Sequence, residues 1–258
     1  MKSIRLRILL LLFVGAMPSG LSQGWSTDWS NGGNDYIAGW NLRPEDKFLS
    51  GEFVYVGWTE LFAVHPSGFA SLLSGGTSWW SNWGTSNGWI GPGSQGSGWN
   101  IGSVDQYLLF KPHNSSLDYI FAVNATTHYA MLLYFSSSGG NHFVTSWSNG
   151  GLGTIGGWSI ASTDRYVSGN FSSAHGSEEV LFINPNGWAT LQYAPSGQSW
   201  SSVWSNGGSG GISGWSISSG DRYQAKDFDG DGIDELLCVS GGTWSAILKF
   251  NGSGWTWV

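Results

Sequence analysis

Short apolar runs separated by glycine, serine and asparagine set the pattern of this chain. In the last forty residues, four runs are expected to be strands, at residues 221–228, 235–239, 244–250 and 254–258. In the third run Trp244, Ala246, Leu248 and Phe250 alternate with other residues and would share one face. A period of two predicts β-strands. No stretch sustains the 3.6-residue period of a helix, so the pattern predicts an all-β fold.

The same landmarks return about every 59 residues. Gly-Trp pairs end at Trp40, Trp99, Trp158 and Trp215, with spacings of 59, 59 and 57 residues. An aspartate lies six positions after each of these tryptophans, at Asp46, Asp105, Asp164 and Asp221. Since these aspartates recur once per unit, we expect them to fix turns. Landmarks that repeat in register indicate one supersecondary unit copied four times.

Four hairpin-linked strands per unit are typical of a propeller blade. The sequence therefore predicts a β-propeller of four repeats with four-stranded blades, closed into a four-blade ring. Residues 25–33 match residues 200–208, the tail of a unit, and are expected to complete the last blade, because the chain stops at Trp257-Val258. Such closure would hide exposed sheet edges. The alternative is half of a larger ring, completed by a second chain.

The N-terminus has the features of a targeting segment. The basic residues Lys2, Arg5 and Arg7 precede an apolar run at residues 8–17, which is too short to span a bilayer. We expect residues 1–22 to be a signal peptide, residues 23–258 to be the propeller domain, and the protein to be secreted. No later segment is apolar enough to predict membrane insertion.

The excess of acidic over basic residues indicates which partners the protein can bind. The chain has 10 Lys+Arg against 17 Asp+Glu, a net charge of −7 that becomes about −10 without the signal peptide. This balance disfavours nucleic acid as a partner and suits cation binding. Cys238 is the only cysteine, so no intrachain disulfide forms, and it is expected to be a buried small hydrophobe.

One acidic loop, residues 227–235, is built for a specific chemistry. Aspartates alternate with glycines there, and Gly230 and Gly232 let the backbone turn tightly. Ca²⁺ takes six to eight oxygen ligands in a flexible cage. The absence of His and Cys from the loop disfavours a transition metal. The expected ligands are Asp227, Asp229, Asp231, the carbonyl of Ile233, and Glu235, with Asp234 as a supporting or substitute ligand.

The loop differs from an EF-hand, whose twelfth position is Glu, because Cys238 stands there inside a β-like run. Phe-Asp-Gly-Asp-Gly before an apolar strand, in a repeat of about sixty residues, resembles the FG-GAP repeats of integrin α chains and the related VCBS repeats. The resemblance implies propeller blades, calcium at the aspartate loop, and roles in adhesion or glycan binding. Only the fourth repeat carries the metal motif, and integrin propellers have seven blades.

Tryptophan supplies the candidate ligand contacts. The chain has 18 Trp, and those locked to the repeat are expected to pack between blades. Tryptophans off the repeat pattern are better candidates for exposed contact, and they include Trp58 and Trp188. The segment from Trp80 to Trp89 concentrates three of them near polar residues, so Trp80, Trp83 and Trp89 are the predicted ligand contacts.

Together these features predict a secreted, non-catalytic, calcium-binding propeller that recognises a glycan or an extracellular protein. One alternative is a structural or adhesion scaffold without a small ligand. Another is an extracellular hydrolase or lyase. The two matches to the nucleophile-elbow pattern, at residues 84–88 and 207–211, lack a following helix and so do not indicate a hydrolase.

Overall fold

The computed structural model describes residues 36–75, 80–85, 89–90, 98–138, 140–175, 177–194 and 199–258. Within these ranges the chain forms strands, turns and loops, and it contains no helix able to cross a membrane. The segments at residues 1–22 and 25–33 lie outside the described residues. Cys238 is free and fully buried, as predicted.

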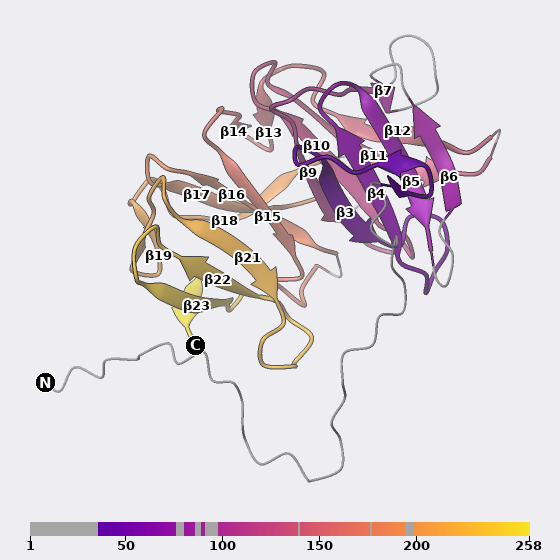
Figure 1. Ribbon diagram of the computed structural model, residues 1–258. Helices are drawn as coiled ribbons and strands as arrows, with labels where there is room; N and C mark the ends of the chain where they lie inside the picture. The colour runs from indigo at the N-terminus through magenta and orange to yellow at the C-terminus, as the bar shows by residue number, and fades with distance from the viewer. Residues whose placement is uncertain are drawn as a thin grey trace, which may run out of the picture.

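Sixteen of the strands form four antiparallel sheets of four strands each (Figure 1). The first blade is β3 (Lys47–Gly51), β4 (Glu60–His65), β5 (Phe69–Ser74) and β6 (Trp80–Thr85). The second is β9 (Gln106–Phe110), β10 (Tyr119–Asn124), β11 (Tyr129–Ser136) and β12 (His142–Ser148). The third is β15 (Arg165–Gly169), β16 (Glu179–Asn184), β17 (Trp188–Tyr193) and β18 (Ser201–Ser205). The fourth is β21 (Arg222–Lys226), β22 (Glu235–Val239), β23 (Ser245–Phe250) and β24 (Trp255–Trp257).

The blades are arranged as a four-bladed β-propeller, which confirms the predicted fold class. The first strand of each blade lies toward the middle of the molecule (Figure 1). Among these strands β3 contacts β9, β9 contacts β15, and β15 contacts β21. Each blade pairs its strands in chain order, as a meander of hairpins. A register shift between the third and fourth strands recurs in the first three blades.

A two-stranded hairpin precedes every blade. The four hairpins pair β1 (Tyr36–Ile37) with β2 (Trp40–Asn41), β7 (Trp89–Ile90) with β8 (Trp99–Asn100), β13 (Thr154–Ile155) with β14 (Trp158–Ser159), and β19 (Gly211–Ile212) with β20 (Trp215–Ser216). Gly39, Gly157 and Gly214 have φ of 85°, 86° and 84° in their turns. Glycine adopts this left-handed conformation without steric cost. The recurring Gly-Trp pair is therefore the end of a hairpin turn.

Apolar side chains pack between neighbouring blades in three clusters. Phe62 of the first blade meets Phe143 of the second edge-on, with ring centroids 5.3 Å apart. Phe121 of the second blade lies 6.2 Å from Tyr166 of the third. Phe171 of the third blade lies 5.2 Å from Trp255 of the fourth. Burial of these faces is the main driving force that holds each blade to the next.

An acidic residue just before the second strand clamps the second, third and fourth blades, each to the blade before it. The Asp234 N–H donates to the Asn170 carbonyl at 2.7 Å, and Asp234 Oδ2 accepts the Asn170 N–H at 2.8 Å. Asp118 makes the same two bonds to Glu52, and Glu178 makes them to Lys111. Asp234 therefore serves the junction between the third and fourth blades, a role that the sequence did not predict.

The seam between the fourth blade and the first differs from the other three junctions. Thr59 stands at the clamp position of the first blade, and in the described part of the chain no clamp joins it to the fourth blade. Phe228 is 44% exposed, whereas its equivalents Phe53, Phe110 and Phe171 are fully buried. Within the described residues, Phe228 is thus only partly covered at this seam, unlike its three equivalents.

The last blade carries its own fourth strand. Trp255 of β24 pairs with Phe250 of β23, and Val258 donates a backbone hydrogen bond to Ile247. Trp255 packs against Phe171 as part of the core. Residues 255–257 thus form the backbone pairs of the fourth strand, and residues 25–33, which were expected to complete this blade, lie outside the described residues.

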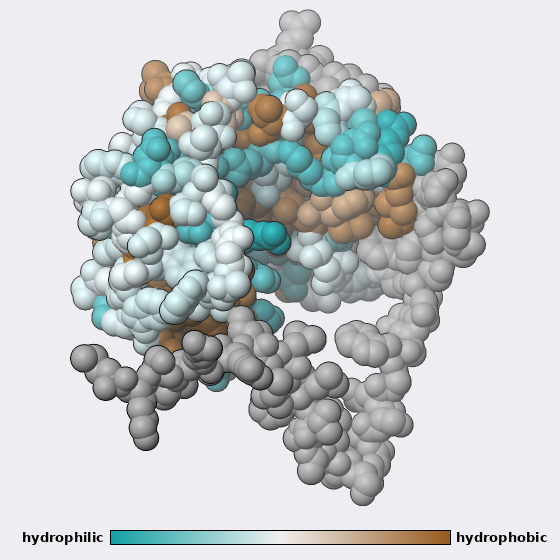
Figure 2. Space-filling view, turned by 60° about the vertical axis from the view of Figure 1, so that its left-hand side comes forward, coloured by the Kyte–Doolittle hydropathy of each residue, from teal (hydrophilic) through white to brown (hydrophobic). Residues whose placement is uncertain are grey.

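The surface follows from the composition. Only 10% of the residues are charged, while glycine is abundant, with 41 residues. Figure 2 accordingly shows a face of mostly intermediate hydropathy, with hydrophobic residues interspersed among the polar ones.

We predict that Asp234→Ala destabilises the protein by about 1–3 kcal/mol, because it removes a charged acceptor and leaves the Asn170 N–H unpaired. Urea unfolding measures the change. Thr59→Ala is the matched control, since the same position in the first blade makes no clamp, and it should stay within about 0.5 kcal/mol of the wild type. Equal effects of the two substitutions would contradict the clamp.

Burial raises the pKa of the Glu178 carboxyl to about 7, although the hydrogen bond from the Lys111 N–H lowers it in part. A raised folded-state pKa means that the contribution of this group to stability is fully present below its unfolded pKa and is lost as the pH rises through 7. We therefore expect the wild type to lose up to about 3 kcal/mol, relative to Glu178→Gln, between pH 5 and 8. Chemical unfolding at several pH values measures this difference, and parallel profiles would refute it.

Candidate functional site: a pocket repeated in successive blades

A tryptophan–aspartate hydrogen bond recurs in all four blades, buried in the second and fourth and partly buried in the first and third. Indole Nε1 donates to aspartate Oδ2 over 2.6–3.0 Å in the pairs Trp40–Asp46, Trp99–Asp105, Trp158–Asp164 and Trp215–Asp221. The same oxygen accepts the backbone N–H three residues before the aspartate. The aspartates therefore fix turns, as predicted, and hold the indole ring in place.

A pocket lies over the indole ring in each of the first three blades. The volumes are about 210, 360 and 380 Å³. Each is formed by the Gly-Trp pair, the residue after it, the last residue of the second strand, and the first residue of the third strand. The last two positions are His65 and Phe69, Asn124 and Tyr129, and Asn184 and Trp188.

Each pocket combines an aromatic wall with small polar groups. Phe69 is 44% exposed and Trp188 is 51% exposed, while Tyr129 is half-buried against Trp99. In the fourth blade Ser245 takes this position, and Trp244, directly before β23, is 76% exposed. The predicted shared face therefore holds for Ala246, Leu248 and Phe250, which are buried, but not for Trp244, whose ring turns to solvent.

The polar groups of the pockets are held in place by the fold. Asn124 and Asn184 each donate from Nδ2 to the aspartate of their own blade at 2.6 Å. Their Oδ1 atoms accept backbone N–H groups of the following turn. Asn100, Thr127 and Asn186 also line the second or third pocket. These side chains can offer donors and acceptors to a bound molecule.

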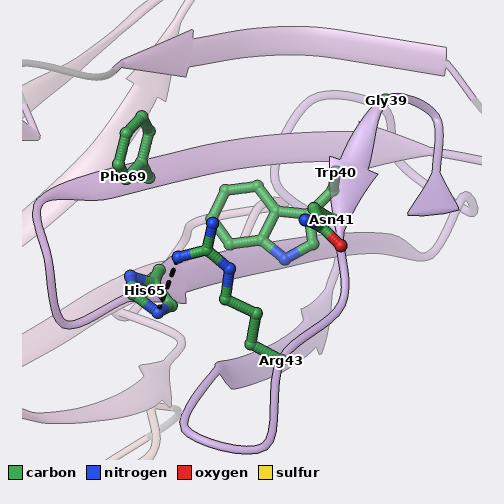
Figure 3. Close-up of a pocket in the computed structure, with 6 residues that line it drawn as sticks. All are labelled: Gly39, Trp40, Asn41, Arg43, His65 and Phe69. Atoms are coloured by element: carbon green, nitrogen blue, oxygen red, sulfur yellow. Dashed lines mark hydrogen bonds between the residues drawn. The ribbon is translucent and has the colours of Figure 1, made fainter. Parts of the chain in front are cut away.

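The first pocket has a different polar set (Figure 3). Arg43 reaches between Trp40 and His65, and its Nη1 lies 3.3 Å from His65 Nε2. The same Nε2 lies 3.1 Å from Glu45 Oε1, and this contact holds the pKa of Glu45 below its ordinary value. The other two pockets have no charged lining residue among the described residues.

The acidic loop at residues 227–235 forms a compact turn. Asp227 accepts N–H groups of Gly230 and Gly232 at 2.6 and 2.9 Å, and Asp231 Oδ1 accepts the Ile233 N–H at 2.9 Å. Oxygens of Asp227, Asp229 and Glu235 all lie within 4.8 Å of one another. This donor set fits a hard cation such as Ca²⁺. The structure brings these three predicted ligands together, but Asp231 lies outside that group.

The Lys249 ammonium reaches into the same carboxylates. Its Nζ lies 2.6 Å from Asp229, 2.7 Å from Asp231 and 2.8 Å from Glu235. The hydrogen bonds to Asp229 and Asp231 raise the pKa of Lys249, and Lys249 in turn lowers the pKa of Asp231. Sequence reasoning missed Lys249 because it comes from β23, which follows the loop by a whole strand.

Glu235 has a role that does not depend on a metal. Its Oε2 accepts the Phe228 N–H at 2.9 Å. Glu60 and Glu179 occupy the same place in the first and third blades, where each accepts the N–H of the equivalent phenylalanine. All three glutamates are fully buried. This residue therefore secures the loop in blades that lack the aspartates as well.

The predicted tryptophan contacts have different outcomes. Trp83 on β6 packs edge-on against Phe143 with centroids 5.0 Å apart, so it belongs to the interface between the first two blades. The side chains of Trp80 and Trp89 lie outside the described part of the structure. Trp188 is exposed, as expected, and lines the third pocket. The sequence reasoning missed the first and second pockets. The feature that could have predicted them is the aromatic residue at the start of the third strand, Phe69 or Tyr129.

No family model and no curated protein matches this chain. Among solved structures, the fold is similar to a SapL1 lectin in complex with alpha methyl fucoside. The identity is 11% and the TM-score is 0.49, over 86% of this chain and 64% of the lectin. The chain thus spans less than two thirds of that lectin's length.

Proposed function

We propose that this protein is a multivalent glycan-binding propeller, with one shallow site in each of several blades. The observation that carries the proposal is the recurrence of an aromatic wall beside fixed polar groups at the same place in three blades. A sugar ring has an apolar C–H face and a rim of hydroxyls. An exposed aromatic ring suits the first, and amide and hydroxyl groups suit the second.

The chemistry of the pockets favours binding over hydrolysis. A glycosidase uses two carboxylates that flank the scissile bond. Among the described residues, the linings of the three pockets include no carboxylate. The aspartate below each pocket already accepts hydrogen bonds from an indole and a backbone N–H. These groups hold the pocket in shape rather than act on a bond.

Several weak sites on one chain can together give strong binding. A shallow site binds one sugar weakly, but several sites on one rigid ring can engage a polymer or a glycan-covered surface together. Such linked binding can exceed single-site affinity by roughly 10²–10⁴-fold. The signal-peptide features of residues 1–22 support an extracellular location, where such glycans are found.

We also propose that the acidic loop binds Ca²⁺ and stiffens the last blade. Asp227, Asp229 and Glu235 would hold the ion, and the resemblance of this loop to FG-GAP repeats supports the proposal. Lys249 and the ion compete for the same oxygens, so the lysine must withdraw when the ion binds. An affinity on the order of 10⁻⁴ to 10⁻³ M would match other extracellular modules.

For glycan binding we predict that Trp188→Ala weakens binding to a multivalent glycan surface by roughly 2- to 10-fold, since an aromatic contact contributes about 0.5–1.5 kcal/mol. Trp188→Ala with Tyr129→Ala should lose more, because avidity falls with each site. A glycan array followed by surface plasmon resonance measures both. Trp58→Ala is the control, because Trp58 is 52% exposed, close to Trp188, but lines none of the three pockets.

Equal losses in Trp58→Ala and Trp188→Ala would place the binding elsewhere than in these pockets. A folded wild-type protein that binds no glycan on the array would overturn the proposed function.

For calcium we expect 10 mM Ca²⁺ to raise the melting temperature of the wild type. At the affinity above, the ion should add about 1–3 kcal/mol to the free energy of unfolding. Asp229→Ala should abolish this gain. Lys249→Met should enlarge it, because the competing ammonium is removed while the carboxylates remain. If Ca²⁺ stabilises only Lys249→Met, then the lysine is the resident cation and the calcium proposal fails for the wild type.

A further inference from the structure

The first pocket differs from its copies at one backbone position. The residue three before each repeated aspartate donates its N–H to that aspartate, and in the four blades it is Arg43, Gly102, Ala161 and Ser218. Three of these are the smallest side chains available, and the first is the longest cation. The backbone role is the same in all four blades, so the turn itself does not require an arginine.

The His65 tautomer removes the His65 ring as a hydrogen-bond acceptor for the Arg43 guanidinium. The Ser67 N–H donates to His65 Nδ1 at 3.1 Å, so Nδ1 is an acceptor and the ring proton is on Nε2. That Nε2–H donates to Glu45 Oε1 at 3.1 Å. It therefore cannot also accept from Arg43, although Nη1 is 3.3 Å away. Within the described part of the chain, Arg43 has no carboxylate within ion-pairing distance.

The guanidinium is also placed for a ligand. Figure 3 shows it inside the pocket, between the Trp40 ring and His65, with Phe69 across the opening. Arginine presents a planar fork of N–H donors that matches a carboxylate in two parallel hydrogen bonds. An aromatic wall and an arginine fork within about 210 Å³ suit a sugar ring that carries a carboxylate.

We propose that the first-blade pocket selects an acidic sugar, of the uronic-acid class, through Arg43, while the second and third pockets take neutral sugars. The inference rests on the proposed function and assigns a ligand class to one of its sites. It gives a single chain sites of two specificities, which fits a heteropolymer that contains both kinds of residue.

The overall charge does not oppose this selection at close range. The net charge of −7 acts mostly over distances at which salt screens it, since the Debye length is about 8 Å at physiological ionic strength. An arginine–carboxylate pair at contact is much less screened. Glu45, the nearby carboxylate, keeps its charge and acts on Arg43 electrostatically, but no salt bridge joins the two side chains within the described residues. Arg43 is therefore the local cation open to the carboxylate of an acidic sugar.

The test uses polyacrylamide conjugates in matched pairs: glucuronide with glucoside, galacturonide with galactoside, and mannuronide with mannoside. Wild type, Arg43→Gln and Arg43→Lys are compared by surface plasmon resonance, with circular dichroism melts to confirm folding. Arg43 is exposed and its N–H bond to Asp46 persists in both variants, so both should fold. We expect Arg43→Gln to lose at least ten-fold in binding of one uronide and Arg43→Lys to keep part of it, with neutral conjugates unchanged.

The two proposals fail in distinguishable ways. If neutral conjugates bind and Trp188→Ala weakens them, but Arg43→Gln leaves every uronide within two-fold of the wild type, the acidic-sugar inference is overturned and glycan binding stands. If no conjugate of either kind binds, the proposed function falls and this inference falls with it. Loss of uronide and neutral binding together in Arg43→Gln would also overturn the selective role of Arg43.

Discussion

The fold and the candidate sites both depend on the hydrogen bond from a tryptophan indole to an aspartate six residues later. It joins the hairpin that precedes each blade to the turn that starts the blade. A buried carboxylate must have partners, and an indole N–H with a backbone N–H meets that need. In three blades a tyrosine hydroxyl donates to the same carboxylate, and burial, together with the carboxylate charge, raises the tyrosine pKa. The ring above this network becomes the floor of a pocket.

A fixed floor allows the rest of the pocket to vary. The backbone frame is the same in each blade, so substitution at the rim changes the ligand without disturbing the turn. The aromatic wall is Phe69, Tyr129 or Trp188, and the neighbouring polar residue is His65, Asn124 or Asn184. Loops held by a rigid scaffold are common places for binding residues. Arg43 is the largest such departure, because its counterparts have almost no side chain.

The fourth blade departs from its siblings in two ways. Its loop adds aspartates around a glutamate that the other blades use only to hold a backbone N–H, and Lys249 balances the added charge. In the described part of the chain, its junction with the first blade also lacks the clamp, because Thr59 stands at that position, and Phe228 is only partly buried there. Both differences lie beside the seam between the fourth blade and the first. A cation in the loop, whether lysine or calcium, would offset repulsion at the least supported end of the sheet series.

Sequence alone determined the blade, because periodic landmarks and alternating strands are local properties of the chain. It gave the four units, the turn role of Asp46 and its equivalents, and the burial of Cys238. Tertiary structure decided which side chains meet. Lys249 enters the aspartate loop from a neighbouring strand, Asp234 turns to the preceding blade, and Trp83 packs inward while Trp244 turns out. Those outcomes depend on the register between strands and the packing between blades, which a single sequence does not encode locally.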